Sequence, residues 1–149
     1  AGRRINDKIP SFVSEQILKR MSKAGISLAE SVVGFMGITF KENCPDTRNS
    51  KAAQLVAELK AWNVNVLVHD TEADPIVVRN EYGIQLVDFE DMRNLDALII
   101  AVPHNSFRRI SVVELLSLYR QKQGPIIADL KRCFDGDALS DSGFDVFSL

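Results

Sequence analysis

Apolar positions along this chain follow two periods. Short apolar runs predict strands at 31–36, 65–69, 97–102 and 125–130, and shorter ones at 85–87 and 145–149. Between them, apolar residues recur every three or four positions and predict helices at 50–62, 74–81 and 112–121, with a helical turn at 88–91. This alternation predicts an α/β fold with a doubly wound parallel sheet between two helical layers. The run 97–102 is the most apolar, so we expect it in the centre of the sheet.

The first 27 residues differ from residues 28–149, which carry the alternating pattern. An amphipathic helix is predicted at 5–24, begun by Asp7 as cap, with Pro10 in its first turn and Gly25 at its end. Its apolar stripe consists of Ile9, Phe12, Val13, Ile17 and Met21. The stripe needs a partner, which is either the sheet of this domain or another chain.

A polar loop, Gly37–Ser50, follows the first predicted strand and reads G-I-T-F-K-E-N-C-P-D-T-R-N-S. Right-handed crossovers place all strand-to-helix loops on one edge of a parallel sheet, where α/β proteins bind nucleotides and phosphates. Lys41 lies in this loop, and Lys131 follows the strand at 125–130 on the same edge. Two ammonium groups on one edge suit a diphosphate.

Arg48 and Phe40, which also lie near this edge, each suit two roles, whereas one role is expected for Asp46. The Arg48 guanidinium suits a phosphate or carboxylate of a ligand, or an ion pair with Asp46 or Glu42. Phe40 either stacks on a ligand ring or packs in the core. Asp46 is expected to shape the turn.

We also expect Asp70 to make a turn or a helix cap, and Asp129 to order the loop that it begins. His104 is expected to have a structural or site-lining role. The histidines (His69 and His104) and the separated cysteines (Cys44 and Cys133) are too few and too scattered to predict a metal site.

Composition limits the class of protein. A length of 149 residues is enough for one domain with a real core, and a net charge of −2 gives no field that would attract nucleic acid. The sequence has no apolar run of membrane-spanning length and no apparent signal peptide. Two cysteines do not make a disulfide framework, so we expect reduced thiols and a cytoplasmic protein.

The loop motif resembles the carboxy-terminal domain of the nucleotide-sugar 6-dehydrogenases, which act on UDP-glucose, UDP-N-acetylhexosamines and GDP-mannose. Its spelling E-N-C-P-D is most similar to the bacterial UDP-N-acetylglucosamine and UDP-N-acetylgalactosamine branch, which makes uronic acids for capsule and O-antigen polysaccharides. Asp129–Arg132 resembles the second substrate motif of the family, and Arg3–Asp7 resembles the end of its central helical region.

The resemblance implies a Rossmann-like domain that binds the UDP part of the substrate through Phe40, Lys41 and Lys131. It implies that Arg48 reaches NAD, which a missing amino-terminal domain would hold. The G-x-G-x-x-G fingerprint of a dinucleotide site is absent after the first strand, as this division of labour requires. The catalytic cysteine of the family lies in the amino-terminal half, so we expect no catalytic residue here and no nucleophilic role for Cys44.

The expected function is therefore the substrate-binding part of an NAD-dependent UDP-N-acetylhexosamine 6-dehydrogenase. Residues 1–27 would end its central dimerisation helix, giving a homodimer or higher homo-oligomer. One alternative is a nucleotide-sensing or receiver-like module without catalysis. A receiver needs acidic residues after its first strand, where this chain has Gly37. Another alternative is an assembly module acting through the leading helix.

Overall fold

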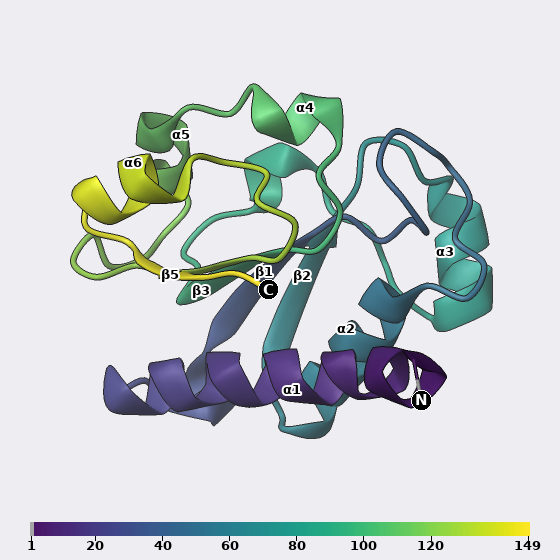
Figure 1. The fold of residues 1–149 in the computed structure, drawn as a ribbon, viewed down its shortest axis with the longest axis horizontal. Helices are drawn as coiled ribbons and strands as arrows, with labels where there is room; N and C mark the ends of the chain where they lie inside the picture. The colour runs from purple at the N-terminus through teal and green to yellow at the C-terminus, as the bar shows by residue number, and fades with distance from the viewer. Residues whose placement is uncertain (1) are drawn as a thin grey trace.

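The computed structural model describes residues 2–149, with side chains from residue 8 onward, and it has a five-stranded sheet at its centre. Every neighbouring pair of strands is parallel, in the order β2-β1-β3-β4-β5 (Figure 1). The strands are β1 Val32–Met36, β2 Asn65–His69, β3 Ala97–Ile100, β4 Ile126–Asp129 and β5 Asp145–Phe147. The predicted doubly wound sheet, its central strand and its short edge strand at the carboxyl end are confirmed.

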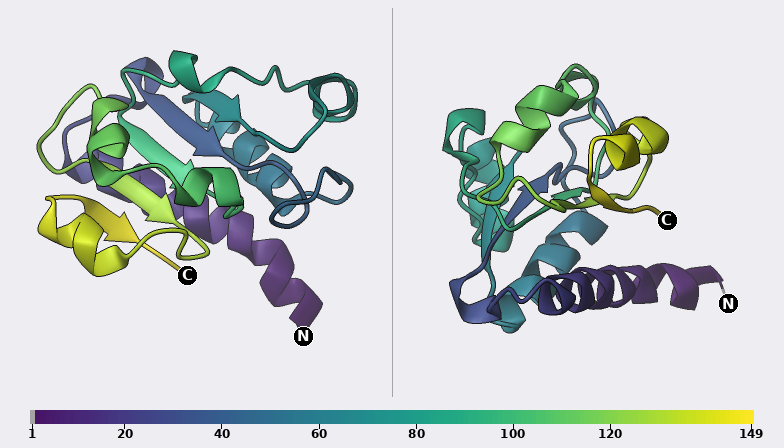
Figure 2. Two further views of the ribbon diagram at one scale, coloured as in Figure 1. Left: turned by 90° about the horizontal axis from the view of Figure 1, so that it is seen from above. Right: turned by 90° about the vertical axis from the view of Figure 1, so that its left-hand side faces the viewer.

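Helices cover both faces of the sheet (Figures 1 and 2). Helices α1 (Gly2–Lys23) and α2 (Lys51–Ala61) lie on one face, while α4 (Asn105–Arg108), α5 (Val112–Ser117) and α6 (Gly136–Asp141) lie on the other. Helix α3 (Pro75–Tyr82) lies beside the β2 edge, and single 3₁₀ turns occupy Leu28–Glu30 and Phe89–Asp91. None of the helices in residues 2–149 has both the length and the apolar character needed to cross a lipid bilayer.

The core consists of two apolar layers, one on each face of the sheet. Val33 and Phe35 of β1 belong to the layer under α1 and α2, whereas Met36 belongs to the layer under α5 and α6. In β3, Ile99 faces the first layer and Leu98 the second. The alternation of a strand thus persists even though both of its faces are buried.

The leading helix docks on its own domain. Val13, Ile17 and Met21 of the predicted stripe are fully buried against α2 and the sheet, and the Arg20 guanidinium pairs with Asp145 at the β5 edge. Phe12, in contrast, is 47 % exposed. Of the two partners left open by the sequence, the domain's own sheet is therefore the one observed.

Several predicted details of the helices were wrong. Helix α1 already begins at Gly2, so Asp7 does not cap it and Pro10 lies inside it. Helix α5 ends at Ser117 because the following residues turn to pair with Leu95. Trp62 and Val113 have the helical spacing of apolar residues in the predicted helices 50–62 and 112–121, yet they are 55 % and 76 % exposed. Trp62 lies just beyond the end of α2.

Two further differences concern short elements. Residues 85–87 form a single parallel bridge between Val68 and Leu86 instead of a strand. Helices α4 and α6 were not predicted, because each has fewer than two turns and too few positions for a 3.6-residue period to show. Asp135 caps α6 by accepting the N–H groups of Asp137 and Ala138, which is a local signal that the sequence did contain.

The docking of α1 predicts a strong effect of one core substitution. We expect Ile17→Ala to lower the free energy of unfolding by about 2–5 kcal/mol, because it leaves a cavity between α1 and α2. Glu15→Ala, on the exposed side of the same helix, should change it by no more than about 0.5 kcal/mol. Urea unfolding followed by circular dichroism measures both. Equal, small effects would show that α1 does not contribute to the core of this domain.

Candidate functional site

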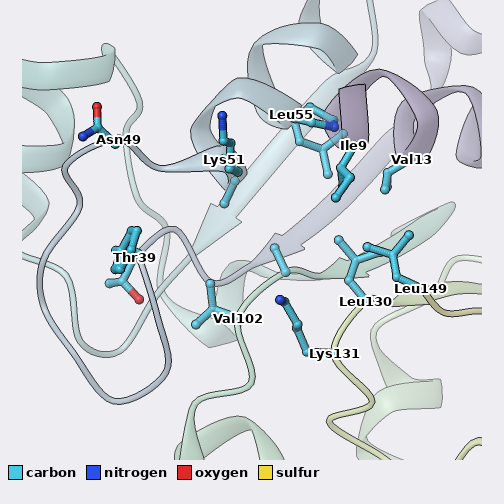
Figure 3. Close-up of a pocket in the computed structure, with 14 residues that line it drawn as sticks. Ile9, Val13, Thr39, Asn49, Lys51, Leu55, Val102, Leu130, Lys131 and Leu149 are labelled. Carbon is cyan, nitrogen blue, oxygen red and sulfur yellow. The ribbon is translucent and has the colours of Figure 1, made fainter. Parts of the chain in front are cut away.

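A groove of about 400 Å³ lies where α1, α2 and the ends of β1, β3 and β4 meet (Figure 3). We call it the carboxyl-edge groove. Its walls are mainly apolar and include Val13 from α1, Leu55 from α2, Val102 after β3 and Leu130 after β4. An apolar cleft with a few polar groups at the carboxyl ends of parallel strands is the usual form of a small-molecule site in α/β proteins.

Cations and an aromatic ring border this groove. Lys131 follows β4 and Lys51 opens α2, and both side chains line the groove (Figure 3). Phe40 also lines it, and this residue is 63 % exposed, so its ring does not fill the core and can stack on a ligand. Lys41 is exposed on the neighbouring loop, outside the residues that line the groove.

Sequence reasoning missed Lys51. Its position was the available signal, since it is the first residue of the helix that follows the loop. An ammonium there lies next to the positive end of the α2 dipole. Lys51, Lys131 and the start of α2 therefore place positive charge beside the groove, and this charge suits an anionic ligand.

The loop Gly37–Ser50 is closed on itself by hydrogen bonds to its main-chain carbonyls. The Phe40 N–H donates to the Asp46 carbonyl at 2.7 Å, and the Thr39 hydroxyl donates to the Lys41 carbonyl at 2.9 Å. At its end, the Ser50 hydroxyl donates to the Ile38 carbonyl at 2.8 Å while capping α2. These bonds hold the ends of the loop together beside β1.

Arg48 makes the ion pair that the sequence left open. Its side chain donates to both carboxylate oxygens of Asp46, at 3.0 and 2.8 Å. These bonds, with the Arg48 main-chain N–H that also binds Asp46, lower the pKa of Asp46 to about 2. The expected turn-shaping role of Asp46 is thus confirmed. Because the Arg48 side chain is 81 % exposed, it can exchange this partner for a ligand phosphate at small cost.

Asp129 orders the turn that presents Lys131, as the sequence predicted. Its two carboxylate oxygens accept the N–H groups of Cys133 and Phe134 at 2.8 and 2.9 Å. Burial raises the pKa of Asp129, and these two bonds only partly oppose the effect. Burial also raises the pKa of the Cys133 thiol to about 11, so this thiol is protonated at neutral pH and is no nucleophile.

Asp70 binds three segments: the start of the loop after β1, its own loop after β2, and His104 after β3. It accepts the main-chain N–H groups of Ile38, Glu72 and Ala73 at 2.7–2.9 Å, which confirms the expected turn role. It also accepts a bond from Nε2 of His104 at 3.0 Å, and both side chains are fully buried. Burial raises the pKa of Asp70, but the bond from His104 and the three N–H bonds together outweigh it and lower the pKa.

Gly34 inside β1 and Gly37 directly after it allow close packing of the neighbouring segments. A Cβ on Gly34 would lie 2.5 Å from the Leu95 side chain, and a Cβ on Gly37 would lie 2.7 Å from the main-chain nitrogen of Val102. Gly37 also has φ +96°, which favours glycine. Gly34 and Gly37 are therefore explained by close packing within the domain and not by contact with a pyrophosphate. Among the described residues, no three His, Cys, Asp or Glu side chains cluster as metal ligands.

The lowered pKa of Asp70 predicts how acid affects stability. The stabilisation is complete above about pH 4, the ordinary range of a carboxyl, and is lost as the pH falls through the lower pKa of the folded state. We expect Asp70→Asn to lower the free energy of unfolding by about 1–3 kcal/mol at pH 7. The difference between the two proteins should shrink below about pH 4.

Urea unfolding of both proteins between pH 7 and pH 3 measures this difference, with Glu90→Gln, a change at an exposed carboxyl, as control. A difference that stays constant across this range would show that the Asp70 carboxylate charge does not stabilise the fold.

Comparison with known proteins identifies the family. The UDP-glucose/GDP-mannose dehydrogenase family, UDP binding domain, matches residues 34–136. UDP-N-acetyl-D-glucosamine 6-dehydrogenase of Salmonella typhi is 40% identical over 131 residues, covering 88% of this chain and 30% of that protein. Protein CapL of Staphylococcus aureus is 34% identical over 140 residues, covering 94% of this chain and 32% of that protein.

Solved structures show the same fold. NDP-N-acetyl-D-galactosaminuronic acid dehydrogenase from Methanosarcina mazei Go1 has a TM-score of 0.86 at 22% identity, with 98% of this chain and 30% of that chain covered. The chain spans about a third of the length of the curated relatives that it matches. It belongs to the UDP-glucose/GDP-mannose dehydrogenase family, as the UDP-binding carboxy-terminal domain.

Proposed function

We propose that the carboxyl-edge groove binds the UDP part of a nucleotide sugar. The observation that carries this proposal is an apolar groove with Lys51 and Lys131 beside it and the exposed ring of Phe40 at its border. Ammonium groups suit the diphosphate, and an aromatic face suits the uracil ring. Lys41 directly follows Phe40 in the loop after β1, and its ammonium group can provide a further cation for the diphosphate.

The parent protein is proposed to be an NAD-dependent dehydrogenase that oxidises the C6 alcohol of a UDP-N-acetylhexosamine to a carboxylate. The 6-dehydrogenase relatives support this substrate class, and the name of Protein CapL supports a role in capsule synthesis. A role in O-antigen synthesis is part of the same proposal. The proposed compartment is the cytoplasm, where Cys44 and Cys133, both free in this structure, would stay reduced.

In this reaction NAD supplies the hydride acceptor, and another domain of the protein would hold it. This chain would contribute binding energy remote from C6, which positions the reacting carbon in the other domain. Arg48, on the same edge, would turn from Asp46 toward the cofactor when the domains close. Assembly into a homodimer or larger homo-oligomer through the region of α1 remains a prediction.

A UDP titration of the isolated chain tests the proposed site. We expect amide shifts in NMR spectra to concentrate at 37–51 and 129–133. Lys131→Ala and Lys41→Ala should each weaken UDP binding about tenfold, because each removes a charge-assisted contact to phosphate. Lys60→Ala, at the far end of α2, is the matched control and should leave the affinity unchanged. Shifts confined to other regions would contradict the proposed site.

Activity assays test the division of labour between domains. We expect the isolated chain to form no NADH from NAD and any UDP sugar. Among its described residues, the glycines at β1 are explained by packing, and the Cys133 thiol has a raised pKa that makes it a poor nucleophile. Absorbance at the NADH band measures this, with the full-length protein as positive control. NADH formation that Cys44→Ser abolishes would instead assign the chemistry to Cys44 of this domain.

A further inference from the structure

His104 lies fully buried between three loops that leave neighbouring strands. Its ring follows β3, while Asp70 follows β2 and Asn43 belongs to the loop after β1. Nε2 of His104 lies 3.0 Å from the Asp70 carboxylate, and Nδ1 lies 2.9 Å from the main-chain nitrogen of Asn43. The back of the ring packs on Phe107, with the ring centroids 5.1 Å apart.

These contacts define the proton positions on the ring. A main-chain N–H can only donate, so Nδ1 of His104 must accept the bond from Asn43 and carries no proton. Nε2 therefore carries the proton and donates it to Asp70, whose oxygens otherwise accept main-chain N–H groups. One neutral tautomer satisfies both neighbours, whereas a proton on Nδ1 would face the Asn43 N–H donor.

A hydroxyl beside the ring binds the carbonyl of Lys41. The Thr39 hydroxyl lies 3.4 Å from Nε2 of His104 and donates to the Lys41 carbonyl. On the other side, the Asn43 side-chain oxygen accepts the main-chain N–H of Asn105, the residue after His104. The hydrogen bonds of Asn43 with His104 and Asn105 tie residues 41–45 to the segment after β3, outside their own loop.

This part of the loop needs such support. Asn43 has φ 59°, a left-handed conformation that costs energy for any residue with a side chain, although asparagine tolerates it best. Lys41 and Phe40 lie two and three residues before it. A loop released from His104 would populate other conformations, and only the fraction in the observed one would present both side chains to a ligand.

We propose that His104, in its neutral Nε2–H form, is a positioning residue for nucleotide binding: it fixes the loop that presents Phe40 and Lys41 beside the carboxyl-edge groove. The role of the loop in UDP binding rests on the function proposed above. The tautomer and the fixed loop do not depend on it.

The first test determines which ring nitrogen of His104 carries the proton. Long-range ¹H–¹⁵N spectra of the wild-type chain at pH 7 should show His104 with a protonated Nε2 and an unprotonated Nδ1, and the Asn43 amide should be protected from hydrogen exchange. A protonated Nδ1, or an unprotected Asn43 amide, overturns the proposal even if no variant folds.

The second test compares variants in UDP titrations. His104→Phe keeps a buried ring but removes both bonds, so we expect UDP to bind roughly tenfold more weakly and the Lys41 and Asn43 amides to shift. His104→Gln offers one donor and one acceptor on a single amide group, and should restore the affinity to within about threefold of the wild type. His69→Gln, at the end of β2 with its Nδ1 bonded to the Val87 carbonyl, is the control and should behave as wild type.

Unchanged affinity and unchanged loop amides in His104→Phe would overturn the proposal, as would equal losses in the Phe and Gln variants. If the wild-type chain binds no UDP at all, the proposed function fails. The ring spectra and the Asn43 amide then still decide whether His104 fixes the loop.

Discussion

The carboxyl edge of the sheet depends on two buried carboxylates that bind main-chain N–H groups. Asp70 follows β2 and Asp129 ends β4, and each binds amides of the loop that it begins. Loops at the ends of parallel strands cannot continue the ladder, so their N–H groups need other acceptors. A carboxylate at the last position of the strand, or directly after it, satisfies two or more of them and fixes the loop relative to the sheet.

The two carboxylates differ in what opposes their burial. Asp70 receives a bond from His104 in addition to three main-chain N–H groups, and its pKa falls. Asp129 has two main-chain N–H donors, while Arg108 and Arg132 act on it only through space, and its pKa rises. Two aspartates at the carboxyl ends of strands thus have opposite pKa shifts, because the number of hydrogen bonds decides whether desolvation is compensated.

On this edge of the sheet, the negative charges of Asp70 and Asp129 are buried, and the positive charges of the lysines are exposed. The carboxylates of Asp70 and Asp129 are turned inward and bound to protein, whereas the ammonium groups of Lys41 and Lys131 are carried by exposed residues. An anionic ligand therefore meets cations without meeting the carboxylates that hold the loops in place. The buried carboxylates thus order the loops, while the surface that faces a ligand stays positive.

The sequence predicted the sheet well because parallel strands are buried on both faces, and such strands are apolar runs that can be recognised without tertiary information. The strand predicted at 65–69, for example, has the same bounds in the structure. It failed where a side chain's surroundings come from distant segments. Val113 has the helical spacing of a core residue but faces solvent, and Lys51 acquires its place in the groove only when α1 and β4 are brought beside α2. The partner of His104, 61 residues away in the loop after β1, left no periodic signal.

The position of the groove follows from how the switch point of the sheet is filled. In doubly wound folds a ligand usually enters the crevice where neighbouring strands send their helices to opposite faces, which here lies between β1 and β3. Gly37 brings the chain against Val102 at this point, and the loop after β1 covers His104 above it. The protein thus occupies its own crevice, and the open space lies toward α1 and β4, beside Lys131. The carboxyl-edge groove therefore lies on the α1 side of the sheet, while the loop after β1 and the His104 network fill the crevice between β1 and β3.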